Sequence, residues 1–458
     1  MDELKDSQIS KELQGLLSDK RQIESELSAL PELKLDDAIR NGLAQGKRRT
    51  RQRARWRTSM QLGGALVCIF ILLTGFIRVS PAFASIMKEI PGFSRFVELI
   101  DYDSSLKSAL DNEFMQHVGV SAESNGYKAT VESIMADRQR LIILYTVEGP
   151  GIDQNTDFVD YKLDNANGDP LEAGIRSSYY YQDPEDMKDG KLYDYLDVML
   201  GSNQEMPEQI MFALKPGEEW LELPFSIDHE KFAHMKEQID LNKTFEIAGQ
   251  SFTINDILIT PLQVTVHFES KTNHEIRANS FINMVLEDEQ GRRYTSDGGF
   301  GTLDDGLFER NFQSGFFAKP KELTLRIEGL HLSEKGKTFV VNTDTMETLK
   351  SPLSNIRLVH AEEKEDHYEI KIEMQGLDNI SSTVGYTFFE HKGSFRDAAG
   401  NSYDILDRSG TQMEWRSGEE NVANYYYNIP KADYVQPLTF DVDQYPGYVE
   451  ESISIRIK

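Results

Sequence analysis

The sequence predicts a mainly β protein that combines tandem β-sandwich domains with one transmembrane helix and a short α-helical arm before it. Three observations predict this fold class. An uncharged, apolar run interrupts the chain near its N-terminus. From Gly126 onward, apolar residues alternate with a period of two, as they do in half-buried strands. One order of strands and hairpins then occurs three times along the remaining chain.

The uncharged run, Met60–Ile77, has the length of a membrane span. At about 1.5 Å per helical residue it reaches roughly 27 Å, close to the thickness of a bilayer's hydrocarbon core. A buried helix of a soluble protein is the weaker interpretation, because such a helix seldom lacks a polar stripe and seldom has many cations on one flank. Seven basic residues directly precede the run: Lys47, Arg48, Arg49, Arg51, Arg53, Arg55 and Arg57.

This basic segment predicts the orientation of the chain. Positive charge beside a span stays in the cytoplasm, so we expect a single-pass protein of the cell membrane with residues 79–458 outside. The same cations attract anionic lipid headgroups at the membrane interface. Residues 1–59 carry thirteen Lys and Arg against ten Asp and Glu, whereas the whole chain has a net charge of −27. The outer part is therefore strongly acidic, which excludes nonspecific binding of nucleic acid.

A signal peptide is the alternative reading of the span, because Pro81–Ser85 resembles a cleavage site near Ala84. We favour an uncleaved anchor, since more than forty patterned residues precede the basic segment and the apolar run is longer than a usual signal. The only cysteine, Cys68, lies within the run. The outer residues must therefore fold around packed cores without disulfides, as in the exterior of a Gram-positive bacterium.

The cytoplasmic arm, residues 1–59, has apolar residues at helical spacing on both sides of Pro31. Two short amphipathic helices cannot bury a core by themselves, so they lie on the bilayer or on a partner. The arm contains neither His nor Cys, which excludes the usual structural zinc site. The expected partner-binding residues are Leu13, Leu16, Leu17, Leu35, Ile39 and Leu43.

Outside the membrane we expect three domains, at residues 78–230, 231–345 and 346–458. The first begins with juxtamembrane helices, for which the apolar spacing predicts Phe83–Leu99, with a break at Pro91-Gly92, and Ser104–Gln116. Strands with alternating burial follow, for example at Leu141, Ile143, Tyr145 and Val147.

The internal repeat predicts the architecture of these three domains. Each repeat has a strand pair, a hairpin and a late strand, and the hairpins span 163–171, 286–294 and 395–403. Gly168, Gly291 and Gly400 occupy their turns, where glycine supplies the positive φ that such turns need. Roughly 105–125 residues with many short strands is the size of an immunoglobulin-like β-sandwich.

No catalytic motif is present, so we expect no enzymatic activity and no cofactor. The sequence lacks G-x-S-x-G, S-x-x-K, H-E-x-x-H and P-loop patterns, and thiol chemistry is excluded outside because no cysteine is there. We interpret the acidic segment with Asp297, Asp304 and Asp305 as a solvated loop rather than a metal site.

Three stretches carry a family resemblance: Leu30–Arg49, Ser80–Ile100 and Gly126–Gly149, placed around the span. In this order they resemble the DUF4179 family of bacterial single-span proteins, over about residues 30–230, and the later domains resemble the immunoglobulin-like modules that often follow. The resemblance implies an anti-sigma-factor-like role, with the arm holding an extracytoplasmic-function sigma factor and the outer domains sensing the envelope. None of the three stretches is catalytic. An arm of 59 residues is short for a complete sigma-binding domain.

The sequence therefore predicts a membrane-anchored regulator of an extracytoplasmic-function sigma factor, with an outer region that senses a cell-envelope ligand. The alternative is a cell-wall-associated binding or adhesion protein whose arm is only an anchor. The two differ in whether the apolar residues of the arm are needed for anything besides membrane insertion.

Overall fold

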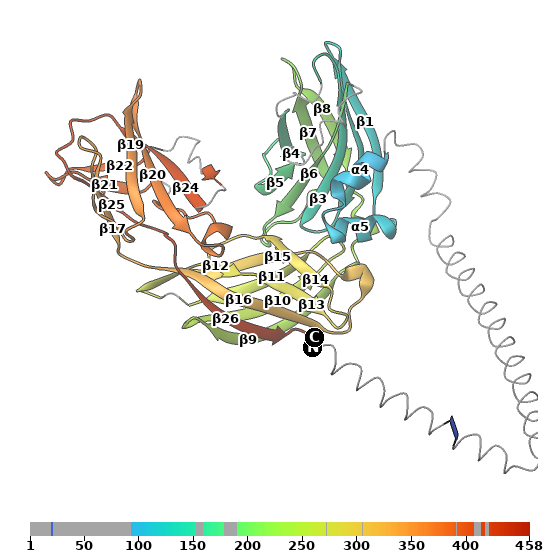
Figure 1. Cartoon of the computed structure of the whole chain (residues 1–458). Helices are drawn as coiled ribbons and strands as arrows, with labels where there is room; N and C mark the ends of the chain where they lie inside the picture. Colours follow the sequence, from blue (N-terminus) through green and yellow to red (C-terminus); the bar gives the residue numbers. More distant parts are fainter. Residues whose placement is uncertain are drawn as a thin grey trace, which may run out of the picture. The chain divides into compact units, whose positions relative to one another are not determined.

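A computed structural model describes residues 20–21, 93–152, 159–177, 190–271, 273–304, 306–390, 392–406, 414–416 and 421–458. The chain divides into two units, Met1–Ser80 and Pro81–Lys458. The expected span, the basic segment and the apolar residues of the arm lie outside the described residues. Within the described part of the chain, no helix is long and apolar enough to cross a membrane. The rest of this section concerns the second unit, which is mainly β and contains three β domains (Figure 1).

The first β domain has two sheets that share one apolar core. Their strand orders are β1-β2-β3-β6-β5 and β4-β7-β8, and the paired strands that are described are antiparallel. The elements are α4 (Phe93–Ile100), α5 (Ser104–Asp111), β1 (Gln116–Ser124), β2 (Tyr127–Ala136), β3 (Arg140–Glu148), β4 (Asp160–Asn165), β5 (Ala173–Ser177), β6 (Lys191–Leu200), β7 (Gln209–Lys215), β8 (Leu221–Ser226) and the 3₁₀ turn η3 (His229–Lys231).

Strand β3 differs from the expected half-buried strand because both of its faces are covered. Leu141 and Ile143 pack into the core between the two sheets. Ile142 and Leu144 belong instead to a second apolar cluster that includes residues of α4 and α5. The apolar residues therefore run continuously through the strand, as expected for a strand buried on both sides.

Helix α5 is shorter than its apolar spacing predicts, whereas α4 ends one residue beyond the expected Leu99. Helix α4 starts after the Pro91-Gly92 break, and the earlier part of that expected helix is outside the described residues. Helix α5 ends at Asp111 because Glu113 has a positive φ of 59°, after which Gln116 already begins β1. At its other end, Asp103 caps α5 by accepting hydrogen bonds from the amides of Ser105 and Leu106.

The second β domain is built from a nine-stranded network in which β14 belongs to two sheets. One half of β14 pairs with β13 and the other half with β15, which folds the network around a single core. The elements are β9 (Glu237–Ile247), β10 (Gln250–Ile259), β11 (Val264–Ser270), β12 (Ile276–Ile282), β13 (Val285–Asp288), β14 (Arg293–Gly298), β15 (Gly306–Phe312), η4 (Phe316–Ala318), β16 (Leu323–Glu334) and β26 (Tyr448–Arg456).

The third β domain again has two sheets around one core, in the orders β18-β17-β25-β21-β22 and β19-β20-β24-β23. Its elements are β17 (Thr338–Asn342), β18 (Glu347–Lys350), β19 (Ile356–Glu363), β20 (His367–Leu377), η5 (Ser381–Thr383), β21 (Ser394–Arg396), β22 (Ser402–Asp404), β23 (Glu414–Arg416), β24 (Asn421–Pro430) and β25 (Leu438–Asp441).

The last strand corrects the expected boundary of the third domain. Strand β26 leaves that domain and pairs with β16, so it completes the second domain (Figure 1). It does so because Ile455 and Ile457 are buried in the second core. At the other boundary, β17 lies in the third domain and not in the second. The third domain is thus an insertion between two neighbouring strands of the second domain.

The three hairpin turns have the geometry that the repeat predicts. Gly168, Gly291 and Gly400 have φ values of 83°, 76° and 87°. The amide of each glycine donates to the carbonyl three residues earlier at 3.0 Å. Residues with a side chain rarely adopt this backbone conformation, so glycine is favoured at all three positions.

The residue three before each glycine also stabilises its turn, because its side chain accepts turn amides. These residues are Asn165, Asp288 and Asp397. In the second and third hairpins the Asp also faces a tyrosine hydroxyl, from Tyr294 at 3.0 Å and from Tyr403 at 3.4 Å. In the first hairpin, Leu171 takes the place of the tyrosine, so no hydroxyl needs an acceptor there. The side-chain amide of Asn165 takes the place of the carboxylate.

Candidate functional site

The first and second β domains meet where a turn of the second domain enters the helix-covered side of the first. Leu262, between β10 and β11, is fully buried in the cluster that holds α4, α5 and the outer face of β3. We call this contact the junction. Its polar groups are the backbone of Leu262 and the side chains of Asp103, Asp137, Arg140, Arg176, Asp197 and Asp297.

Arg140 is the central cation of the junction. Its guanidinium donates to both carboxylate oxygens of Asp197 at 2.9 Å and to Asp103 Oδ2 at 2.7 Å. All three side chains are almost completely buried. Burial acts to lower the pKa of Arg140, but the charges of Asp197 and Asp103 outweigh it and raise that pKa well above its usual value. Arg140 therefore stays charged, and the helix cap at Asp103 depends on it.

The backbone of Leu262 is held from both sides by the first domain. Its carbonyl accepts a hydrogen bond from Arg140 Nη1 at 2.7 Å, and its amide donates to Asp137 Oδ2 at 3.1 Å. Burial raises the pKa of Asp137, although its hydrogen bonds act in the opposite direction. One turn of the second domain is thus fixed to the strand pair β2-β3 of the first.

Asp297 on β14 approaches this charge cluster from the second domain. It is half-buried, and its Oδ2 has no hydrogen-bond partner among the described residues. Burial and the negative charge of Asp103 raise the pKa of Asp297 to about 6, against the pull of Arg140 and Arg176. The interpretation of this residue as part of a solvated loop is therefore wrong. Asp304 of the same segment forms an ion pair with Lys335 at 2.9 Å.

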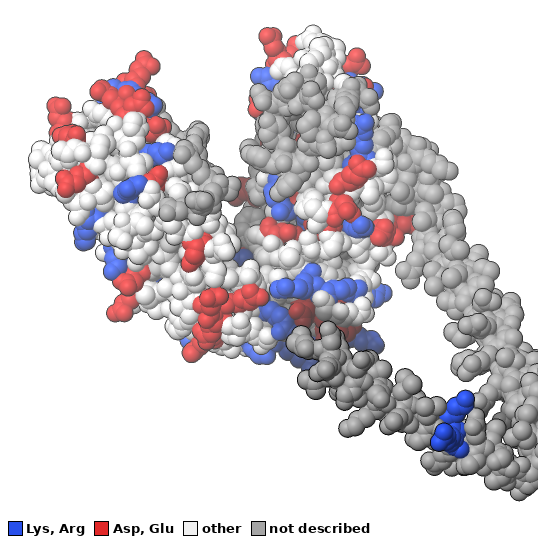
Figure 2. Space-filling view, in the orientation of Figure 1, with Lys and Arg blue, Asp and Glu red and all other residues white. Residues whose placement is uncertain are grey.

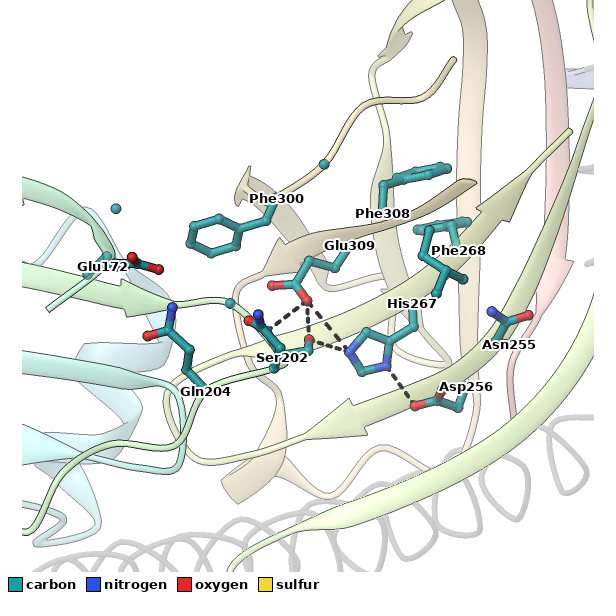
Figure 3. A pocket seen from close by; sticks show the side chains of 16 residues that line it. Glu172, Ser202, Gln204, Asn255, Asp256, His267, Phe268, Phe300, Phe308 and Glu309 are labelled. Carbon is teal, nitrogen blue, oxygen red and sulfur yellow. Dashed lines mark hydrogen bonds and ion pairs between the residues drawn. The ribbon is translucent and has the colours of Figure 1, made fainter. Parts of the chain in front are cut away.

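A second set of contacts joins the two domains beside the junction (Figure 3). Ser202, just after β6, lies 2.6 Å from His267 Nε2 on β11, and its amide and hydroxyl both contact Glu309 Oε2 on β15. The other ring nitrogen of His267 lies 2.7 Å from Asp256 Oδ1. We call these four residues the clasp.

Each ring nitrogen of His267 faces an oxygen of the clasp. Nδ1 faces Asp256 Oδ1 and Nε2 faces the Ser202 hydroxyl, which in turn contacts Glu309 Oε2. Which of these atoms donates depends on the tautomer of the ring.

Ser202, His267 and Asp256 have the connectivity of a serine-hydrolase triad, but Glu309 makes the clasp different. A nucleophilic serine gives its proton to histidine, and nearby amides stabilise the oxyanion. Here the Ser202 hydroxyl and amide are both engaged by the Glu309 carboxylate. A negative charge at this position opposes the formation of an oxyanion on the same side. The arrangement can hold two domains together more readily than it can catalyse acyl transfer.

The clasp forms one wall of a pocket of about 930 Å³. Residues 172–174 and 201–204 of the first domain line it together with residues 255–256, 267–268, 300–301 and 307–309 of the second. The ring of Phe300 fits over two glycines, with an ideal Cβ lying 3.7 Å from the ring at Gly174 and 3.8 Å at Gly201. This volume is within the range of small-molecule sites.

The candidate residues from the sequence are not among those that the structure describes. The six apolar residues of the arm and the seven cations all lie outside the described residues. Within the described residues, no group of three His, Cys, Asp or Glu has the arrangement of a metal site. Acidic and basic side chains are interspersed over the visible face (Figure 2). Sequence reasoning missed the junction and the clasp, since their members are far apart along the chain.

In comparisons with known proteins, two stretches of the chain match models of two families. Residues 54–149 match DUF4179, a domain of unknown function, and residues 236–372 match DUF5643, a family of unknown function. A crystal structure of a conserved domain protein from Bacillus anthracis covers 52% of this chain and 84% of its own length, at 14% identity and a TM-score of 0.38. No curated protein matches the chain. Arg140 lies in the DUF4179 match, whereas Leu262, His267 and Glu309 lie in the DUF5643 match.

Proposed function

We propose that the chain is a membrane-anchored, anti-sigma-factor-like regulator with an outer sensing region. In this proposal Met60–Ile77 spans the membrane, the arm binds an extracytoplasmic-function sigma factor inside the cell, and the three β domains are immunoglobulin-like modules outside. The seven cations before the span and the match to DUF4179 support this arrangement. DUF4179 itself has no assigned function, so the regulatory role rests on the features of this chain.

The proposal that the outer region is a sensor rests on one observation, the pocket between the first two β domains. A site built from two domains changes when the domains move, so a ligand in it favours one arrangement of them over another. The clasp and the junction are the contacts that such a movement would loosen or tighten.

The same contacts provide a physical route from the pocket toward the membrane. Asp103 caps α5 with one carboxylate oxygen and accepts from Arg140 with the other. Helix α4 directly precedes α5 and packs in the same apolar cluster. In our proposal, a change at the junction alters how α4 and α5 are held, and the preceding segment carries this change to the span.

The arm supplies the output in this proposal. Burial of an exposed leucine or isoleucine contributes roughly 1.5–3 kcal/mol before the costs of ordering and association are subtracted. Six such side chains are enough for a partner complex of micromolar affinity or better.

Replacement of three arm residues by Asp tests the proposal. L35D, I39D and L43D, combined in the full-length chain, should release the sigma factor and raise transcription of its target genes. Membrane insertion should continue, because the span and the basic segment are unchanged. A matched variant with S28D, N41D and Q45D, which adds the same three negative charges outside the apolar positions, should leave transcription as it is. Unchanged transcription in the combined L35D, I39D and L43D variant would favour the cell-wall-binding alternative.

A further inference from the structure

The residues that line the pocket beside the clasp restrict the class of ligand that it can bind. Three of its described lining residues are carboxylates, Glu172, Asp256 and Glu309, and none is Lys or Arg. His267 is the single group there that can carry positive charge, and the clasp already engages it with Asp256 and Glu309. The lining therefore retains an excess of negative charge.

Glu309 is an independent sign of a missing partner. The residue is 6% exposed, and its Oε2 is engaged by Ser202. Its Oε1 is buried and has no hydrogen-bond partner among the described residues. Figure 3 shows the carboxylate between Phe300 and Ser202, with Oε1 turned away from the clasp. A buried carboxylate oxygen without a donor is unfavourable, so a donor that enters beside Phe300 would be stabilised.

The nearest arginine does not supply that donor. Arg310 follows Glu309, but its guanidinium lies over the ring of Phe308 at 5.0 Å. Its Nη1 donates to main-chain carbonyl oxygens, including that of Glu309 at 2.7 Å. Arg310 is also not among the residues that line the pocket.

The remaining lining combines amide side chains, from Asn203, Gln204 and Asn255, with apolar and aromatic groups. The rings of Phe268 and Phe308 are stacked, with centroids 5.0 Å apart and planes 5° apart. Leu307 also lines the pocket and is 74% exposed. Aromatic faces attract cations and also bury apolar groups.

We propose that this pocket binds a primary ammonium group carried on an aromatic or alkyl body. The ammonium faces Glu309 and Glu172, and the body packs against Phe300 and Leu307. This inference names the class of ligand for the proposed sensor, and its biological consequence rests on that proposed function. Binding itself can be measured separately.

Calorimetric titration of the purified full-length chain tests the proposal. The chain is held in nanodiscs of phosphatidylcholine, which carries no net charge, and empty nanodiscs give the background. The probe is phenethylammonium, compared with 2-phenylethanol and 3-phenylpropionate, which keep the ring and change the charge. We expect phenethylammonium to bind with a Kd of about 1 mM or tighter. The alcohol and the acid should bind at least tenfold more weakly.

Variants locate the site. E309Q should weaken binding of phenethylammonium at least tenfold, and E172Q, at the exposed rim, at least threefold. E347Q makes the same charge change on an exposed residue of the third domain and should leave the Kd unchanged. Because E309Q also alters the clasp, its thermal unfolding is measured alongside, and E172Q provides the test if E309Q does not fold.

Several results would overturn the inference: no saturable binding, equal binding of the neutral alcohol, or an equal loss of binding in E347Q and E172Q. Failure of the proposed function gives a different result. In that case, transcription of the target genes does not change in cells that carry the combined L35D, I39D and L43D variant. If phenethylammonium binds and transcription does not respond to the arm variant, the ligand site is supported and the regulatory role is contradicted.

Discussion

The hydroxyl oxygen of Ser202 lies 2.6 Å from Nε2 of His267, 65 residues further along the chain. This contact crosses from the first β domain to the second. Beside it, the hydrogen bond from Arg140 to the Leu262 carbonyl connects the region that matches DUF4179 to the region that matches DUF5643. The account of this protein as a sensor depends on that connection.

Arg140 should be among the residues whose loss destabilises the outer region most. R140M leaves the buried Asp103 without its cation and the buried Asp197 with Arg176 alone, which costs about 3–5 kcal/mol of unfolding free energy. Urea unfolding followed by circular dichroism measures the change. R138M is the matched control, because Arg138 pairs with Glu205 at an exposed position and should contribute less than about 1 kcal/mol. Equal losses in the two variants would contradict the role of the buried network.

Asp297 should make stability depend on pH between about 4 and 6. Its pKa is raised to about 6 in the folded chain, so its contribution to stability is fully present below its unfolded value of 3.8 and is lost as pH rises through about 6. Asparagine cannot ionise, so D297N removes the cost of charging this partly buried side chain above about pH 6. The variant should therefore have a flatter profile of Tm against pH than the wild type and a higher Tm at neutral pH.

Calorimetric scans from about pH 4 to pH 7 measure these profiles. D344N, at an exposed carboxylate of the third domain, should reproduce the wild-type profile. A D297N profile that parallels the wild type would show that Asp297 does not titrate in this interval.

Ser202 should not behave as a catalytic nucleophile. Its amide and hydroxyl are held by Glu309, so a fluorophosphonate probe should not label the full-length chain. Intact-mass spectrometry after incubation with the probe detects such an adduct, and a known serine hydrolase in the same tube shows that the probe is active. A stoichiometric adduct that disappears in S202A would establish an enzyme here.

Local features of the fold could be predicted from the sequence because neighbouring residues determine them. Gly168, Gly291 and Gly400 mark turns whose positive φ depends on a few residues, and the period-two pattern identified the strands around them. The pairing of β26 with β16 could not be predicted in this way. It depends on burial of Ile455 in the core of the second domain, more than a hundred residues from its partner strand.

The site was hidden from the sequence for the same reason. Arg140 stands in an apolar stretch, where a charged residue usually indicates the end of a strand, and its partners Asp103 and Asp197 lie in other elements. Ser202, Asp256, His267 and Glu309 form no recognised motif. One signal was present: a run of apolar residues through β3 without alternation, which indicated that something covers both faces.

Topology can be tested in intact cells. Protease added to protoplasts should digest residues 128–458 and spare a tag at Met1, because we expect the N-terminus inside. Lysed protoplasts, in which both ends are digested, serve as the control. Protection of a C-terminal tag in intact protoplasts would reverse the proposed orientation.

The regulatory claim is tested most directly by what the chain binds inside its native host. The full-length protein, tagged at its C-terminus, is isolated from membranes, and the copurified proteins are identified by mass spectrometry. We predict that an extracytoplasmic-function sigma factor is recovered with the wild type and lost with the combined L35D, I39D and L43D variant. Recovery of no sigma factor, from preparations in which residues 1–59 are shown to be intact, would contradict the account.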